Sequence, residues 1–273
     1  MPRVFHAIFV VWGNPPHNLR SLLRQSKEGL GALANPKKTE GSAEDTRQQF
    51  VNFVYYKVDP AWRRLPEEER KRGKCQFIDV VKSYEKDVIV IPYSLVGIRG
   101  DCDFMLWRIT YDLPNFQEMT AKLLATGLGK YLTTPYSYLS MTKRSVYVDK
   151  HEHEGQEGRR LRLMPGKFKY VFVYPFVKNK AWYRLTQHAR QGMMNEHIEI
   201  GHKYPTVRLN TTYSFGLDDQ EFVLAFESDR PEHFLELVME LRHSEATSYT
   251  LRDTPIFTCV HGELGEVLDL LGG

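Results

Sequence analysis

The sequence predicts an α+β fold built from two copies of one β-α-β-β-α-β unit. Three observations predict it: an internal repeat, the order of strand and helix patterns in the second copy, and the length of 273 residues. At about 150 residues per domain, that length allows one large domain or two small ones. A hydrophobic fraction of 42% and a charged fraction of 26% are typical of a folded, water-soluble protein, and they disfavour disorder or membrane spanning.

The repeat consists of pairs of similar segments that follow one another in the same order. The segments Val54–Leu65 and Tyr174–Leu185 both end in Ala-Trp-x-Arg-Leu after an aromatic, extended run. The other pairs are Tyr93–Gly97 with Tyr213–Gly216, Asp103–Trp107 with Glu221–Ala225, and Pro114–Met119 with Pro231–Leu237. Because the separation is nearly constant, the similarity predicts a duplicated unit.

The second copy begins with a strand and a helix. Aromatic residues alternate with Val171 and Val173 over Tyr170–Phe176, which predicts a strand buried on both faces. A helical pattern follows through Met193, Met194, His197, Ile198 and Gly201, and ends near Tyr204-Pro205, since proline stops a helix.

A hairpin, a second helix and a last strand complete this copy. The hairpin strands are Val207–Ser214 and Glu221–Phe226, joined by a turn at Gly216–Asp219. Ser228 or Asp229 is expected to cap a helix with core-facing positions at Phe234, Leu237, Val238 and Leu241. Ile256–Val260 supplies the last strand. This order is that of the ferredoxin-like unit, and the first copy supports the same interpretation.

Composition along the chain predicts the domain boundaries. We expect a flexible N-terminal extension at 1–48, a first ferredoxin-like repeat at 49–148, a linker at 149–166 and a second repeat at 167–262. The apolar run Val4–Trp12 could be the core of a signal peptide, an N-terminal strand or the mark of an alternative start. The run is short for a membrane span and no cleavage site follows at the expected distance, which disfavours the signal peptide.

Charge and cysteines exclude several classes of protein. Lys and Arg number 37 against 34 Asp and Glu, and this balance disfavours dedicated nucleic-acid binding. The cysteines, Cys75, Cys102 and Cys259, are far apart, which excludes a disulfide framework or a zinc finger and favours the cytoplasm.

Two residues of the second copy could carry chemistry. His197 lies on a helix stripe with Gly201 one turn away, and that glycine leaves room for a flat ring system to approach the imidazole. A half-exposed histidine without a ligand is the alternative. Tyr174 is a phenol on a strand of Val and Phe, with Lys178 four residues later, and is either a core aromatic residue or a redox-active tyrosine. On the opposite strand Val207, Leu209, Thr211 and Tyr213 share one face.

The polar motif His151-Glu152-His153-Glu154 offers the ligand types of a metal site. Because it lies in a charged, glycine-containing insertion, a solvated loop is the favoured interpretation. The acid and base cluster Arg63–Arg72 is interpreted as a solvated helix face.

The segment from Phe50 to Val260 resembles the chlorite dismutase-like superfamily of haem proteins, and within it the coproheme decarboxylases. The strings that carry the resemblance are YPFVKNKAWYRL, MMNEHIEIGHKYP, YSFGLDDQEFVLAFESD, LRDTPIFTC and, from the first copy, VGIRGDCDFMLW. The resemblance implies two ferredoxin-like repeats packed as a dimeric α/β barrel, with haem in the C-terminal repeat.

The resemblance also implies roles for individual residues. His197 would be the axial ligand of the haem iron and Glu245 the acid that strengthens it. Tyr174 matches the catalytic tyrosine and Lys178 its partner. Trp182 would lie at the haem edge and Arg162 would hold a propionate. Leu209 stands where chlorite dismutases carry an arginine that stabilises their intermediate, so chlorite dismutation is not expected.

The expected activity is that of coproheme decarboxylase. Fe-coproporphyrin III would be both substrate and redox centre, and two oxidative decarboxylations with hydrogen peroxide would give haem b. Tyr174 would relay the oxidation as a phenoxyl radical. Coproporphyrin ferrochelatase is the expected donor of coproheme, and a homopentamer is the expected assembly.

The alternative functions are a non-enzymatic haem-binding or haem-sensing protein and a monooxygenase-type barrel without haem. His151 and His153 remain candidates for the distal base.

Overall fold

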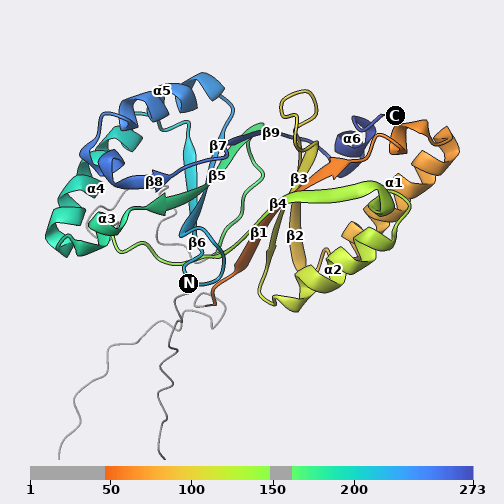
Figure 1. Cartoon of the computed structure of the whole chain (residues 1–273), viewed down its shortest axis with the longest axis horizontal. Coiled ribbons are helices and arrows are strands. Elements are labelled where there is room, and N and C mark those ends of the chain that lie inside the picture. The colour runs from red at the N-terminus through yellow and green to blue at the C-terminus, as the bar shows by residue number, and fades with distance from the viewer. Residues whose placement is uncertain (1–46, 148–161, 273) are drawn as a thin grey trace, which may run out of the picture. The chain divides into compact units, whose positions relative to one another are not determined.

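The computed structural model describes residues 47–147 and 162–272. The predicted extension therefore lies almost entirely outside the described residues, as do Val4–Trp12 and the motif His151–Glu154. Among the described residues, two sets of antiparallel strands are flanked by helices (Figure 1). None of the described helices combines the length and apolar character needed to cross a membrane.

The first unit has the predicted order of elements. Its bounds are β1 (Phe50–Val58), α1 (Glu67–Ser83), β2 (Val88–Ser94), β3 (Phe104–Thr110), α2 (Pro114–Ala125) and β4 (Leu132–Met141), with short 3-10 helices η2 (Trp62–Arg64) and η3 (Gly129–Tyr131). The strands lie in the order β4-β1-β3-β2, which is the ferredoxin-like arrangement.

The second unit repeats this order. Its elements are β5 (Tyr170–Lys178), α3 (Lys180–Arg184), α4 (Gln187–His202), β6 (Arg208–Tyr213), β7 (Phe222–Ser228), α5 (Pro231–Leu241), η5 (Glu245–Tyr249), β8 (Thr250–Arg252) and β9 (Phe257–His261). The strand order β9-β5-β7-β6 matches that of the first unit. The first strand and the long first helix of each unit begin 120 positions apart, at Phe50 and Tyr170 and at Glu67 and Gln187.

The strands of the two units meet at two short seams. Met141 of β4 pairs with Tyr213 of β6 at one seam. Tyr93 and Ser94 of β2 pair with His261 and Val260 of β9 at the other. Since β5 also pairs with β7, the succession of paired strands returns to its starting point.

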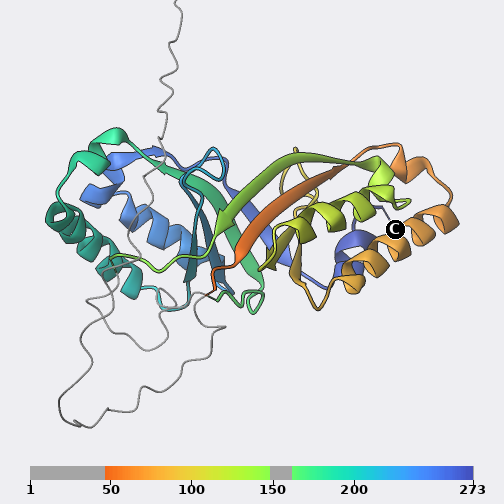
Figure 2. The same ribbon diagram turned by 90° about the horizontal axis from the view of Figure 1, so that it is seen from below.

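Apolar side chains of the described residues form three buried cores. One core contains strand and loop residues from both units and no residue of a helix, among them Trp107 and Phe257. The other two lie between strands and helices, one in each unit, so the helices cover only the outer faces of the strands (Figure 1, Figure 2).

The start of α5 differs from the sequence prediction. Neither Ser228 nor Asp229 caps the helix, because Ser228 is the last residue of β7 and Arg230 occupies the N-cap position. Pro231 fixes the helix start, since its restricted φ suits the first helical position and it has no N–H to satisfy. The Ser228 hydroxyl instead accepts a hydrogen bond from the N–H of Arg230 at 3.0 Å.

The C-terminal residues add a helix that the repeat does not contain. Helix α6 (Leu264–Asp269) follows β9 and buries Val267, Leu268 and Leu271 in the core of the first unit. The C-terminal end of the chain therefore packs against the first unit, although it follows the last strand of the second.

Candidate functional site

The helix-covered face of the second unit carries the predicted site residues on its strands. Directly paired residues of antiparallel strands point to the same side of a sheet. Tyr174 pairs with Leu224, which pairs with Thr211, and Leu209 pairs with Phe226. Because Phe226 packs against α5 through Phe234, all these side chains face the helices. Leu209 and Thr211 thus share one face of the strand, as the sequence predicted.

Fewer apolar side chains are fully buried between these strands and helices than in the first unit, and we call this region the sparsely filled space of the second unit. Its core holds five buried apolar residues, Phe172, Ile200, Phe226, Phe234 and Leu237, whereas the corresponding core of the first unit holds seventeen. Leu209 faces the helices yet is 42% exposed. The expected burial of both faces of β5 is accordingly wrong for Tyr174 and Phe176, which are only half-buried. Leu209, Tyr174 and Phe176 thus form an apolar surface that other side chains cover only in part. Such a surface suits a flat, largely apolar ligand.

His197 projects from α4 into this region. Its Nδ1 is buried without a hydrogen-bond partner. Burial, and secondly the charge of Lys178, lower the pKa of the imidazole to about 4. The ring is therefore neutral at neutral pH, which is the form that binds a metal ion. A Cβ added at Gly201 would meet no atom within 4 Å, so the helix surface one turn from His197 is open.

Tyr174 belongs to the same apolar surface. Its ring stacks on Phe226 with centroids 5.9 Å apart. Burial and the nearby carboxylate of Asp253 raise the pKa of the phenol, while Arg242 opposes them. Arg242 and Asp253 form an ion pair of 2.6 Å. The phenol therefore stays protonated at neutral pH and holds a hydrogen that can be transferred.

Lys178 and Trp182 form a second group at the end of β5. The Lys178 Nζ lies 4.6 Å from the centroid of the Trp182 ring and donates a hydrogen bond of 2.6 Å to the Ala246 carbonyl. Burial lowers the pKa of Lys178 to about 8, and the charge of Glu221 opposes that shift. Trp182 is fixed in the short helix α3, whose first turn is capped by the Asn179 side chain.

Two of the predicted site residues, Arg162 and Glu245, lie at the edge of the candidate site. Arg162 is exposed at the edge of the described residues. Glu245 begins η5 next to α4, since its N–H donates to the Glu196 carboxylate at 3.4 Å. Because Nδ1 of His197 has no partner, no hydrogen bond joins Glu245 to it in this structure.

Sequence reasoning missed three charged residues around the site. Asp253 and Arg242 act on the phenol of Tyr174, and Glu221 binds the backbone of Lys178. Glu221 carried a detectable signal, because the repeat aligns it with another acid, Asp103. The ion pair between Arg242 and Asp253 joins two loops that no local pattern connects.

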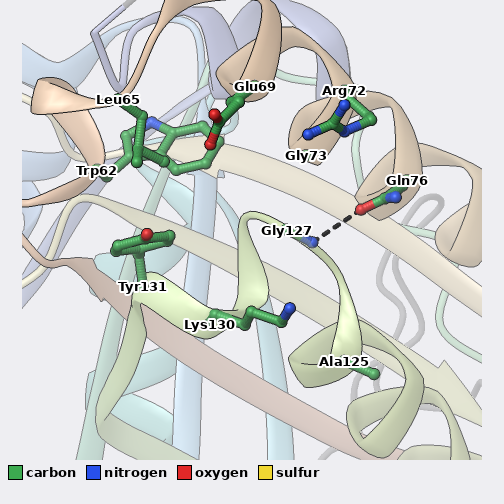
Figure 3. A pocket seen from close by; sticks show the side chains of 10 residues that line it. All are labelled: Trp62, Leu65, Glu69, Arg72, Gly73, Gln76, Ala125, Gly127, Lys130 and Tyr131. Atoms are coloured by element: carbon green, nitrogen blue, oxygen red, sulfur yellow. Dashed lines mark hydrogen bonds between the residues drawn. The ribbon is translucent and has the colours of Figure 1, made fainter.

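Two other features do not contribute to this site. A hollow of about 270 Å³ in the first unit lies between α1 and the segment after α2, and its charged residues Glu69, Arg72 and Lys130 are exposed to solvent (Figure 3). Over 47–147 and 162–272, no three His, Cys, Asp or Glu residues gather in a way that would hold a metal ion.

Comparison with known proteins assigns the chain to a family. The sequence profile of the family described as chlorite dismutase matches residues 70–262. The chain is 31% identical over 228 residues to a coproheme decarboxylase of Mycolicibacterium smegmatis, covering 81% of this chain and 93% of that protein.

Solved structures agree with this match. A mutant chlorite dismutase from Candidatus Nitrospira defluvii superposes with a TM-score of 0.76 at 25% identity, covering 82% of this chain and 96% of that one. The same enzyme in complex with imidazole superposes with a TM-score of 0.75, also at 25% identity, over 82% of this chain and 95% of that one. With a family profile that matches residues 70–262 and a relative that is 31% identical over most of both chains, this chain belongs to the chlorite dismutase family.

Proposed function

We propose that this protein is a coproheme decarboxylase that converts Fe-coproporphyrin III to haem b. The observation that carries the proposal is the placement of His197, Tyr174 and Lys178 around one sparsely filled, apolar space in the second unit. The coproheme decarboxylase of Mycolicibacterium smegmatis, similar over most of its length, supports the same assignment.

The residues fit an iron porphyrin. His197 offers a neutral imidazole beside an open helix surface at Gly201. The exposed Leu209 and the half-buried Leu224 form an apolar wall that suits a flat macrocycle. Bound there, the iron porphyrin supplies the capacity to be oxidised by hydrogen peroxide. Glu245 is the acid proposed to pair with the free Nδ1 of His197, because its backbone already contacts the preceding residue, Glu196.

Tyr174 is the proposed hydrogen-transfer residue. Its half-buried, protonated phenol would give one electron to the peroxide-oxidised porphyrin and lose one proton, and the resulting phenoxyl radical would take a hydrogen atom from the β-carbon of a propionate. Loss of a second electron and of carbon dioxide leaves a vinyl group. Each propionate thus consumes one hydrogen peroxide and one proton and yields one vinyl group, one carbon dioxide and two waters, and two propionates react in turn.

Lys178 is the proposed carboxylate-binding residue. Its ammonium is charged below pH about 8 and lies in a largely desolvated position, where it attracts a propionate more strongly than in water. The face of Trp182 supports the Lys178 side chain. Arg162 is proposed to hold a further propionate from the exposed edge of the site.

The side chain of Leu209 disfavours chlorite chemistry. Leu209 carries no hydrogen-bond donor, and one donor to a developing oxyanion commonly contributes about 3–4 kcal/mol. We further propose that the closed succession of strands is the family's dimeric α/β barrel, that the chain assembles as a homopentamer in the cytoplasm, and that coproporphyrin ferrochelatase supplies coproheme.

The test is to add ferric coproporphyrin III and hydrogen peroxide to the purified protein and follow the porphyrin by mass spectrometry. Loss of carbon dioxide and two hydrogens from each of two propionates supports the proposal. Coproheme that binds tightly but stays unaltered favours the alternative, a haem-binding or haem-sensing protein. Haem binding alone requires His197 as a ligand but does not require both Tyr174 and Lys178.

A further inference from the structure

The carboxylate of Glu221 joins the end of β5 to helix α3. Its Oε2 accepts a hydrogen bond of 2.8 Å from the N–H of Lys178 and one of 2.6 Å from the hydroxyl of Tyr183. Lys178 is the last residue of β5, and Tyr183 follows Trp182 on α3. One oxygen atom therefore fixes the two segments that carry the ammonium and the indole.

The first unit contains the same bond without a site beside it. Asp103 Oδ2 accepts a hydrogen bond of 2.8 Å from the N–H of Val58, the last residue of β1. The backbones also correspond, because the N–H of Asp103 donates to Tyr56 and that of Glu221 to Phe176. In both units an acid just before the third strand thus secures the end of the first strand.

The two acids differ in their remaining partner. Asp103 also binds the exposed end of Lys57, at 2.9 Å, whereas Glu221 binds Tyr183. At the position of Lys178 the first unit has Val58, which is 1% exposed and belongs to the core. Of the two strand ends, only that of the second unit carries a cation, and the cation lies against Trp182 and close enough to His197 for its charge to act on the imidazole.

We infer that Glu221 is a positioning residue that holds Lys178, through its backbone, at the place where a porphyrin carboxylate binds. This inference rests on the proposed function for the identity of the carboxylate. It does not require that the decarboxylation occurs, since a fixed Lys178 would also favour coproheme over haem b in simple binding.

The experiment measures binding without peroxide. The dissociation constants of ferric coproporphyrin III and of haem b are determined by Soret titration for the wild type, Glu221→Ala, Lys178→Ala and the double variant. We expect each single variant to lower the preference for coproheme by about fivefold, and the double variant to lower it no further than Lys178→Ala alone. Glu221→Gln keeps an acceptor oxygen and should restore most of the preference.

Asp103→Ala is the matched control, because it removes the same strand-end bond from the unit without a site. It should lower thermal stability and leave the preference unchanged. Should Glu221→Ala fail to fold, Tyr183→Phe takes its place in the cycle, since it removes only one hydroxyl of the same arrangement.

The inference is overturned by an unchanged preference in the Glu221 variant, by additive losses in the double variant, or by an equal loss in Asp103→Ala. It is also overturned if the wild type does not prefer coproheme. A lowered preference together with a wild type that releases no carbon dioxide supports the positioning role and refutes the proposed reaction.

Discussion

His197 occupies on α4 the position that Phe77 occupies on α1. Each lies the same distance after the tryptophan of its repeat, Trp182 in the second unit and Trp62 in the first. Phe77 is fully buried, whereas His197 is half-buried with a free Nδ1. A core aromatic residue in one copy is thus an imidazole in the other, and only the copy with the imidazole has a sparse core.

This relationship predicts an acid-sensitive apoprotein. Burial lowers the pKa of His197 from 6.5 to about 4, so the unfolded chain binds more protons than the folded one between these values. Stability should fall as the pH drops from 6.5 to 4, by up to about 3 kcal/mol from this residue. His197→Phe, which copies Phe77, should flatten this dependence in denaturant unfolding measured at pH 7 and at pH 4.5.

The exposed His188 on the same helix supplies the control. His188→Gln should retain the acid sensitivity of the wild type. If His197→Phe and the wild type lost the same free energy of unfolding between pH 7 and pH 4.5, protonation of His197 would not be the cause of the acid sensitivity.

Iron ligation gives a second prediction for His197. His197→Ala should weaken binding of ferric coproporphyrin III and shift its Soret band, because the axial nitrogen is lost, and added imidazole should partly restore the wild-type spectrum. His188→Ala should leave the spectrum unchanged. A wild-type spectrum in His197→Ala without imidazole would rule out the axial role.

Lys178 predicts a pH dependence of binding. Its ammonium is charged below pH about 8 and loses its charge as the pH rises through that value, so its attraction for a carboxylate is lost on the alkaline side. A bound carboxylate raises the pKa of its partner, which places the midpoint in the complex at or above 8. The preference for coproheme over haem b should therefore shrink between pH 7 and pH 9.5.

Two variants isolate this effect. Lys178→Met should show a small preference that no longer changes with pH, while Lys180→Met, at an exposed position of α3, should behave like the wild type. A pH dependence that survives in Lys178→Met would assign the titration to another group.

Because residue 209 is a leucine, we expect the protein not to convert chlorite to oxygen. The haem-loaded wild type should release no oxygen from chlorite, because Leu209 donates no hydrogen bond. Leu209→Arg places a guanidinium on a side chain that is 42% exposed, where it fits without overpacking, and should raise oxygen release above that of Leu209→Gln. Rapid oxygen release by the wild type would contradict the role given to Leu209.

The order of the elements could be predicted from sequence because both units keep clear local periods. The alternation around Val171 and Val173 gave β5, and the spacing of Phe234 to Leu241 gave α5. The same patterns placed His197 and Tyr174 in one unit, and the shared face of Leu209 and Thr211 followed from the period of the strand.

Long-range features escaped prediction because they have no local signature. The seam at Met141 and Tyr213 consists of one pair, and the burial of Val267 depends on a core far away in sequence. The ion pair of Arg242 and Asp253 likewise joins separate loops. Tyr174 is half-buried because the helices contribute few side chains to this core. The residue pattern of a single strand carries no information about the helices that cover it.

The most direct test of the central claim compares Tyr174→Phe with the wild type. Both should bind ferric coproporphyrin III with similar affinity, because the phenol hydroxyl is not needed for ligation or for the charge of Lys178. On addition of peroxide the wild type should convert coproheme to a product that has lost two carboxyl groups, and Tyr174→Phe should leave coproheme almost entirely unconverted. Equal yields of the doubly decarboxylated porphyrin from both proteins, measured by mass spectrometry, would contradict the assignment of Tyr174 as the hydrogen-transfer residue.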